Sequence, residues 1–281
     1  MKKNPRVVAI IQARTGSTRL PGKVLMPIVG KPVLWHIVNR LKYCRNIDAI
    51  VVATTNKISD KPIIETAKEI GVDAFAGSEE DVLDRYYQAA KKFCAKVVVR
   101  ITADCPLLDP KIVDTVIDYY LTHSVDYVNT GPSFPEGVDN EVFSFDSLKK
   151  AWENAKKPFE REHVSIYIHE HPEIFEIATI ENDIDLSQVR FSVDRLEDII
   201  VVRKIFENLY REGEVFHLND VLNFLQNHPE IKEINKEVPR NEGFISSLKK
   251  EGMDVKNPNA PFSEWVSKYS SKKENKPENE K

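Results

Sequence analysis

The chain has 281 residues, of which 41% are hydrophobic and 30% are charged, and its formal net charge is −4. This length suffices for one large α/β domain with appendages, and the near-neutral charge argues against nonspecific nucleic-acid binding, which needs a basic surface. No apolar run approaches the roughly 20 residues of a transmembrane helix, and the run near the N-terminus is too short for a signal peptide. The cysteines Cys44, Cys94 and Cys105 lack metal-type spacing, so we expect a cytoplasmic protein without disulfides and without membrane or nucleic-acid partners.

Short β-branched runs alternate with amphipathic stretches in the first half of the chain. The runs predict strands at Val7–Ile11, Ile50–Ala53 and Val97–Ile101. The stretches predict helices at Val33–Tyr43, Pro62–Ile70 and Asp81–Phe93. Such alternation implies parallel strands with right-handed crossovers, and therefore an open, three-layer α/β sheet. Ligands bind these sheets at the carboxyl ends of the strands, so residues 10–32, 53–56 and 102–109 should converge on one cleft.

The pattern changes between Asn129 and Asp185, which we interpret as an arm inserted in the main sheet. Within it, Glu141–Phe145 alternates like a strand, and Asp146 is a candidate cap for a helix that ends at Asn154. Later segments predict a strand at Arg190–Asp194, a helix at Leu196–Tyr210 and another near Asn219–Gln226. The prediction is one domain over residues 1–245, with the arm at 129–185, and a polar segment at 246–281 whose last dozen residues are disordered.

The stretch from Ile10 to Pro32 reads IIQARTGSTRLPGKVLMPIVGKP. It is not a Walker A loop, because Gly16 and Gly22 enclose five residues and no Ser or Thr follows Lys23. Backbone amides together with Arg14, Arg19 and Lys23 could surround a triphosphate. The alternative is an ordinary solvated basic loop.

This stretch resembles the signature of the sugar-acid cytidylyltransferases, which include the KDO and acylneuraminate cytidylyltransferases. The resemblance is strongest to the spore-coat polysaccharide biosynthesis protein F family and extends over roughly residues 6–245. The further matching segments, in chain order, are ATTN (53–56), GSEEDVLDRY (77–86), RITADCPLLDP (100–110), GVDNEVFSF (137–145), EREHVSIYI (160–168) and FSVDRLEDI (191–199).

The resemblance implies a glycosyltransferase-A-like nucleotidyltransferase fold and transfer of CMP from CTP, with Mg²⁺, to an anionic sugar-type acceptor by a homodimer. It implies that Arg14, Lys23, Asp104 and Asp194 are catalytic. The nucleotide-binding residues that it implies are Gln12, Ala13, Arg14, Gly16, Arg19, Lys23, Thr54, Thr55, Ser78 and Arg85. The acceptor-binding residues that it implies are Asp139, Glu141 and Arg161.

Asp104 and Asp194 each follow a predicted strand, and the resemblance assigns them to the metal. Carboxylate oxygens completed by phosphate and water are what Mg²⁺ prefers. The alternative for either residue is a turn or a helix cap, since Asp194 could cap the helix that begins at Leu196. Here the chain also departs from the family, which usually has Thr-Pro-Glu-Asp where this chain has Arg195-Leu196-Glu197-Asp198.

Other charged residues have equally ordinary interpretations. Asp139 and Glu141, two apart on the predicted strand, should face the same side. Arg161 lies in a dense charged cluster that could be a solvated helix face, and His163 beside it is more typical of a structural residue. Two rival functions remain: a glycosyltransferase that uses a nucleotide-sugar donor, and a noncatalytic nucleotide-binding protein of a polysaccharide pathway.

Overall fold

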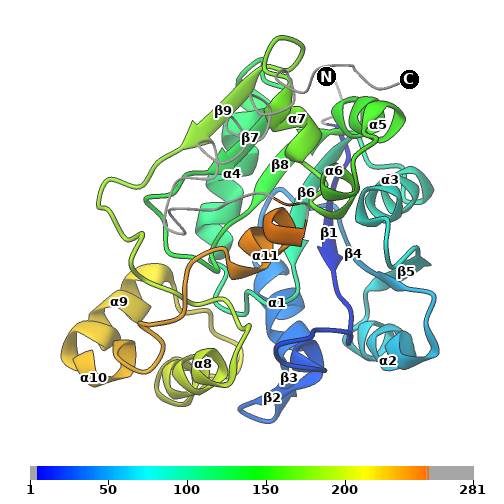
Figure 1. The fold of residues 1–281 in the computed structure, drawn as a ribbon. Helices are drawn as coiled ribbons and strands as arrows, with labels where there is room; N and C mark the ends of the chain where they lie inside the picture. The colour runs from blue at the N-terminus through cyan, green and yellow to red at the C-terminus, as the bar shows by residue number, and fades with distance from the viewer. Residues whose placement is uncertain (1–4, 251, 253–281) are drawn as a thin grey trace.

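A computed structural model describes residues 5–250 and 252 of the chain. Its centre is a seven-stranded sheet in the order β5-β4-β1-β6-β8-β7-β9 (Figure 1). The strands are β1 (Val7–Gln12), β4 (Ala49–Thr55), β5 (Asp73–Gly77), β6 (Val97–Thr102), β7 (Tyr127–Thr130), β8 (Glu141–Ser144) and β9 (Ile177–Ile180). The first four are parallel, β8 runs antiparallel to both β6 and β7, and β9 is parallel to β7. This mostly parallel α/β sheet confirms the predicted fold class.

Helices cover both faces of the sheet, which makes three layers. The helices are α1 (Val33–Leu41), α2 (Lys61–Ile70), α3 (Val82–Lys92), α4 (Pro110–Thr122), α5 (Phe145–Asn154), α6 (Pro158–Glu162), α7 (Ile166–Glu170), α8 (Leu196–Leu209), α9 (Leu218–Asn227), α10 (Pro229–Lys232) and α11 (Glu242–Lys250). Two short 3₁₀ turns, η1 (Lys23–Leu25) and η2 (Ile58–Asp60), and a small hairpin of β2 (Pro27–Ile28) and β3 (Lys31–Pro32) complete the elements. None of these helices is both long and apolar enough to cross a membrane.

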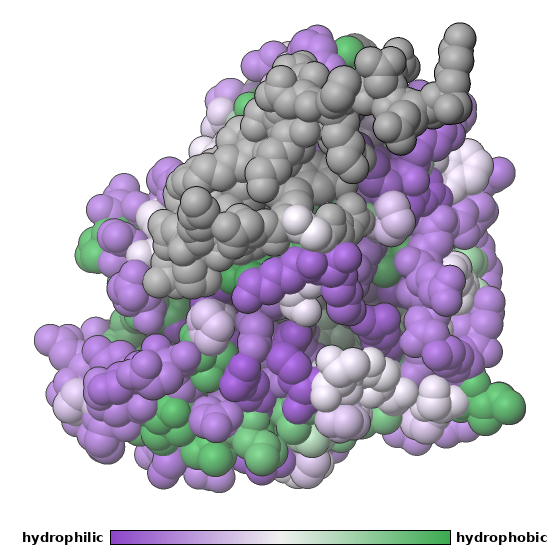
Figure 2. Space-filling model, viewed as in Figure 1, coloured by the Kyte–Doolittle hydropathy of each residue, from purple (hydrophilic) through white to green (hydrophobic). Residues whose placement is uncertain are grey.

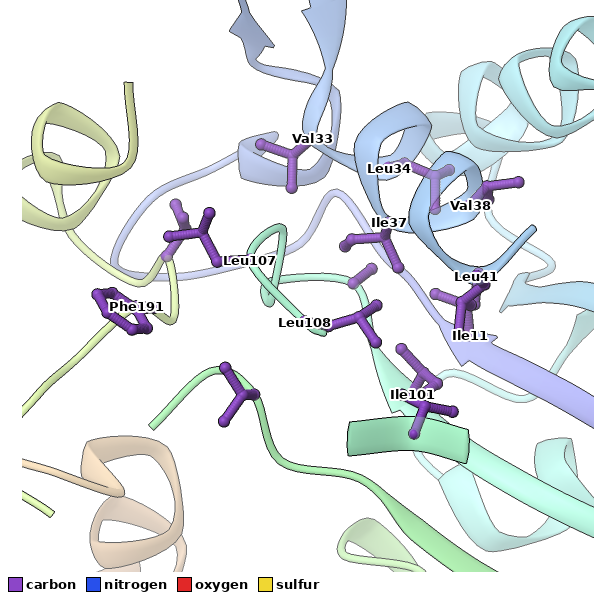
Figure 3. Packing of buried hydrophobic residues seen from close by; sticks show 14 of the residues in the cluster. Ile11, Val33, Leu34, Ile37, Val38, Leu41, Ile101, Leu107, Leu108 and Phe191 are labelled. Carbon is purple, nitrogen blue, oxygen red and sulfur yellow. The ribbon is translucent and has the colours of Figure 1, made fainter. Parts of the chain in front are cut away.

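The side chains of β1 alternate between two separate cores. Ala9 and Ile11 pack in the core formed with α1, α2, α4, α8 and α9, and Figure 3 shows Ile37 and Leu41 of α1 close to Ile11. Val8 and Ile10 pack on the opposite face with α3 and α5. Because a strand buried on both faces is apolar at most positions, β1, β4 and β6 are largely apolar runs, with Arg100 as the charged exception in β6, and their predicted positions are confirmed.

Three local predictions are wrong. Residues Arg190–Asp194 do not form a strand; the only pairing there is an isolated bridge between Glu136 and Arg190. The cap of α5 is Ser144, whose hydroxyl accepts from Ser147 N at 2.8 Å, rather than Asp146. Asp139 precedes β8 instead of sharing that strand with Glu141.

The segment 129–185 is continuous with the main sheet. It contributes β8 and β9 to that sheet and α5, α6 and α7 to one of its faces. Its roles in acceptor binding and dimerisation stay predictions, as do the proposed domain limits. The last dozen residues, which we expect to be disordered, lie outside the described residues.

His36 on α1 is a buried histidine, only 1% exposed, that connects the β2–β3 hairpin to α8. Its Nε2 lies 2.8 Å from the carbonyl oxygen of Ile28, and its ring centroid lies 4.4 Å from that of Phe206. The pKa of His36 is lowered to about 4, mainly by burial. The hydrogen bond to Ile28 raises it, and the charges of Arg40 and Lys31 lower it.

We expect the free energy of unfolding to fall as the pH drops from 6.5 toward 4, because the unfolded chain then binds a proton that native His36 does not bind. By pH 5 the loss from this group is about 2 kcal/mol, at about 1.4 kcal/mol per pH unit. Urea unfolding of the wild type and His36→Phe at pH 7 and pH 5 measures it. Between pH 7 and pH 5 the free energy of unfolding of the variant should fall by about 2 kcal/mol less than that of the wild type. Equal losses in both proteins would contradict the lowered pKa of His36.

Candidate active site

Lys23 joins the two aspartates that were predicted to lie at the carboxyl edge of the sheet. Its Nζ lies 2.7 Å from Asp104 Oδ2 and 2.8 Å from Asp194 Oδ1. Asp104 follows β6, and its carbonyl oxygen accepts from Val193 N at 2.7 Å, which holds the two segments together. Lys23 and Asp194 are only 8% and 7% exposed. The structure thus brings residues 81 and 171 positions apart from Lys23 into one charged cluster.

Asp194 faces three cations. Arg19 Nη2 lies 2.5 Å and Lys23 Nζ 2.8 Å from Oδ1, while Arg190 Nη2 lies 2.8 Å from Oδ2. Burial alone would raise the pKa of Asp194, but Lys23 and Arg19 lower it well below its usual range. Burial would likewise lower the pKa of Lys23, yet Asp104 and Asp194 raise it above the ordinary value. The cluster is therefore fully charged at neutral pH.

Arg190 supports this cluster and was not predicted. Besides Asp194 it binds Asp198 through Nε at 3.0 Å and Glu136 through Nη1. Asp198 is fully buried and also accepts from the backbone N–H of Asp194 at 2.9 Å. The sequence contains one signal for this role, which is that Arg190 stands at the start of RFSVD, a segment in which apolar residues alternate. Its partner Glu136, however, is 54 residues away in the chain.

Asp104 and Asp194 provide carboxylate oxygens to the same point, which is the donor type that Mg²⁺ prefers. Among residues 5–250 and 252, no group of three or more His, Cys, Asp or Glu side chains could hold a metal ion. Two carboxylates are enough where phosphate oxygens and water supply the other ligands. The pair fits an ion that arrives with a phosphorylated ligand, on the condition that Lys23 moves from between the carboxylates.

Asp60 anchors the opening loop, and this residue was also missed. Its Oδ1 accepts from Thr15 N at 2.8 Å and from Thr15 Oγ1 at 2.6 Å, and its Oδ2 accepts from Thr55 Oγ1. Asp60 precedes α2 but makes no capping bond to that helix, because its carboxylate is used by the loop. Arg14, in the same loop, is exposed, and Gly16 near it is also exposed. The loop backbone is thereby held while Arg14 remains accessible.

Two buried polar atoms lie at the ends of adjacent strands. Gln12 ends β1 and pairs in register with Ala53, the neighbour of Thr54 on β4. Gln12 Oε1 and Thr54 Oγ1 have no hydrogen-bond partner among the described residues. Ala13 continues the pairing, since its N–H donates to Ala53 O at 3.1 Å. Unpaired buried polar atoms are uncommon in native proteins, so this edge is suited to a polar ligand.

Arg85 and Ser78 form a third part of the predicted nucleotide site. Arg85 is 2% exposed and donates through Nη1 to the carbonyl oxygen of Ser78, while its Nε has no partner within the described chain. Burial lowers the pKa of Arg85, and the nearby Arg14 lowers it further.

The three predicted acceptor residues each have a different contact partner in the structure. Arg161 donates through Nη2 to Asp81 at 2.6 Å, which joins α6 to the start of α3, and through Nη1 to the carbonyl oxygen of Trp152 at 2.7 Å, which joins α6 to α5. Asp139 accepts from Gly137 N at 2.9 Å. Glu141 instead pairs with Arg100 on β6. These contacts favour a structural role for Arg161, while the acceptor roles of all three stay predictions.

A buried polar cluster, Arg100, Glu141 and His163, lies on the α3 side of the sheet. Each member keeps one buried atom without a partner in the described chain: Arg100 Nε, Glu141 Oε2 and His163 Nε2. Burial lowers the pKa of His163 to about 3, and Arg100 lowers it further. His163 is therefore neutral at physiological pH. The signal in the sequence was Arg100, which interrupts the apolar run of β6.

Comparison with known proteins fits this geometry. The family model described as cytidylyltransferase matches residues 8–237. The spore coat polysaccharide biosynthesis protein SpsF of Bacillus subtilis is 30% identical over 231 residues, which are 80% of this chain and 95% of SpsF.

Two solved structures share the fold. A cytidylyltransferase from Leptospira borgpetersenii has a TM-score of 0.77 and 33% identity, over 81% of this chain and 96% of that one. The CMP:2-keto-3-deoxy-manno-octonic acid synthetase complexed with CTP has a TM-score of 0.59 at 19% identity, over 73% of this chain and all of that one. The predicted resemblance is confirmed, and the chain belongs to the cytidylyltransferase family, among the sugar-acid enzymes near SpsF.

Proposed function

We propose that the protein transfers CMP from CTP to a sugar acid or a related anionic acceptor in polysaccharide or glycan biosynthesis, and releases pyrophosphate. One observation carries the proposal: Lys23 and Arg19, from the loop after β1, meet the carboxylates of Asp104 and Asp194 at the edge of the sheet. A cluster of cations and carboxylates at this edge is what a triphosphate with its metal ion requires. A structural neighbour with the same fold was solved with CTP.

The nucleotide would lie along the ends of β1 and β4. The base would meet the unpaired Gln12 Oε1 and backbone groups of Ala13 and Thr55, while Thr54, whose side chain points to the other face of the sheet, would contribute through its backbone. The phosphates would extend along the loop toward Arg14, Arg19 and Lys23. Asp104 and Asp194 would hold Mg²⁺, which when bound neutralises phosphate oxygens and polarises the α-phosphate.

In the reaction an acceptor oxygen forms a bond to the α-phosphorus, and the bond from that phosphorus to the bridging oxygen of pyrophosphate breaks. The acceptor proton is released, and pyrophosphate departs with the bridging electrons. Lys23, released from its two carboxylates, and Arg19 would stabilise the charge on pyrophosphate. The contribution of the protein is therefore mainly positioning and electrostatic stabilisation.

The acceptor would lie beside the buried polar cluster of Arg100, Glu141 and His163. Their unpaired atoms provide donors and an acceptor for hydroxyl and carboxylate groups. Arg100 Nε can donate to a carboxylate of the sugar, and Glu141 Oε2 can accept from one of its hydroxyl groups. The identity of the sugar does not follow from them.

A screen of the four nucleoside triphosphates against a panel of anionic sugars, scored by pyrophosphate release, tests the proposal. We expect release with CTP and one class of sugar acid. A glycosyltransferase would release no pyrophosphate with any triphosphate, and a noncatalytic protein would bind a nucleotide without turnover. Either result would replace the proposed function.

We further propose that the protein is a cytoplasmic homodimer, with the segment 129–185 at the interface. This proposal rests on the resemblance to the sugar-acid cytidylyltransferases and on the position of β9, which is the edge strand of the sheet beside β7. Light scattering at micromolar concentration should give twice the mass of the 32.2 kDa chain. A monomeric mass would remove the dimer from the proposal.

A further inference from the structure

Helix α11 contacts α6 on one side and Arg19 of the opening loop on the other, and the family match ends before it, at residue 237. Figure 1 shows α11 in front of the central strands, next to α6. Its Phe244 ring centroid lies 5.0 Å from that of Phe159 and 5.1 Å from that of His163. Ser247 Oγ lies 3.2 Å from Glu162 Oε2. One side of α11 therefore contacts α6 and His163, a member of the polar cluster at which we place the acceptor.

The first residue of α11 reaches the phosphate side of the cleft. Glu242 Oε2 lies 3.4 Å from Arg19 Nε, while Arg19 Nη2 contacts Asp194. Glu242 also binds Arg195. Glu242 therefore joins Arg19 of the opening loop to Arg195 at the start of α8. On the described surface in Figure 2 this face is mostly hydrophilic, which suits such exchangeable polar contacts.

The turn before α11 fixes the position of Glu242. Arg240 donates through Nη1 to the carbonyl oxygens of Phe134 and Ser187 at 3.0 and 3.1 Å. The N–H of Asn241 donates to Glu136 Oε1 at 3.0 Å. Glu136 in turn binds Arg190, so the start of α11 is attached to the same ion-pair network as Asp194.

We propose that Glu242 competes with the β- and γ-phosphates for Arg19 and thereby sets the selectivity for nucleotide phosphate length. This inference rests on the proposed function. A carboxylate and a phosphate oxygen are both anions that a guanidinium binds, and the Nε and Nη2 donors of Arg19 that face Glu242 and Asp194 are not available to a triphosphate at the same time. The Arg19 and Glu242 side chains are 29% and 19% exposed, so the pair exchanges at low cost. When pyrophosphate departs, Glu242 returns to Arg19 and disfavours its rebinding.

Calorimetric titration of Glu242→Gln with inorganic pyrophosphate, CTP and CMP, each with Mg²⁺, tests the competition. The substitution keeps the size of the side chain and removes its charge. We expect pyrophosphate and CTP to bind about two- to tenfold tighter, the range of a partly exposed ion pair plus the repulsion of one carboxylate. CMP, which lacks the outer phosphates, should bind as in the wild type. Glu207→Gln, an exposed carboxylate on α8, is the matched charge control and should change nothing.

A second variant tests whether α11 must stay in place for Glu242 to compete. Phe244→Ala removes the contact with Phe159 and His163 without changing charge, so α11 should detach and pyrophosphate should again bind tighter. Unchanged or weaker pyrophosphate binding by Glu242→Gln would overturn the competition. If the wild-type protein still binds CTP, the proposed function stands. Failure of wild type and variants alike to bind CTP or pyrophosphate would overturn both.

Discussion

Asp104→Asn should abolish turnover while leaving the chain folded. The substitution replaces one anionic oxygen by an amide of nearly equal volume, and it removes a ligand that the proposed metal needs. Metal-assisted charge stabilisation is worth several kcal/mol, so we expect pyrophosphate release from CTP to fall about 10²- to 10⁴-fold. In the free protein Asp104 contacts one cation, Lys23, whereas Asp194 contacts three. The fold should therefore tolerate this change.

Asp194→Asn should lose activity to the same extent and also lose stability. Removing one partner of a buried ion pair costs about 3–5 kcal/mol when the remaining charges stay uncompensated, and here Arg19, Lys23 and Arg190 all lose the carboxylate that compensates their charge. The depressed pKa of Asp194 means that its carboxylate stabilises the fold above the unfolded pKa, and that this contribution disappears as the pH falls toward the folded pKa. The variant should therefore be less stable at pH 7 and less sensitive to acid.

Pyrophosphate release and urea unfolding, measured on both variants, separate the two effects. Asp118→Asn is the matched control, because Asp118 is a half-exposed carboxylate paired with Arg45 on the surface. It should retain both activity and stability. Wild-type turnover by Asp104→Asn and Asp194→Asn at low Mg²⁺ would remove the two-aspartate metal site.

The sequence predicts those parts of the fold that depend on short-range patterns of apolar and polar residues. Fully buried parallel strands are apolar at most positions, which locates β1, β4 and β6, and helical spacing locates α1, α2 and α3 to within a residue or two. Because the ends of parallel strands share one edge, the meeting of the opening loop with Asp104 was also predictable.

The residues that were missed act through distant contacts. Asp60 anchors Thr15 from 45 residues away, and Arg190 binds Glu136 from 54 residues away. No local pattern encodes either pair. The mistaken strand at Arg190–Asp194 has the same origin. Phe191 and Val193 are buried because the segment packs against the loop of Glu136 and against Asp104, whose carbonyl oxygens accept from its N–H groups, and not because it belongs to the sheet.

Lys23→Ala should weaken the binding of CTP far more than that of CMP. If Lys23 leaves its carboxylates for the outer phosphates, the variant loses a charge-assisted contact of roughly 1.5–3 kcal/mol, which is about 10- to 150-fold in affinity. CMP lacks the β- and γ-phosphates and should lose little. CDP should fall between the two. In the free variant Asp104 and Asp194 face each other without the ammonium of Lys23. The pKa of Asp104 should therefore rise, because Lys23 lowers it and Asp194 raises it.

Titrating CTP, CDP and CMP, each at fixed Mg²⁺, into the wild type and Lys23→Ala decides the role of the loop. Lys31→Ala is the matched control, because Lys31 is an exposed lysine of the same opening stretch whose ammonium lies over the Trp35 ring. It should bind all three nucleotides as the wild type does. A solvated surface lysine at position 23 would cost almost nothing, but Lys23 is 8% exposed between two carboxylates. A nucleotide-sugar site would show similar losses for diphosphate and triphosphate. Equal losses for the three nucleotides, or none, would therefore exclude a triphosphate contact at Lys23.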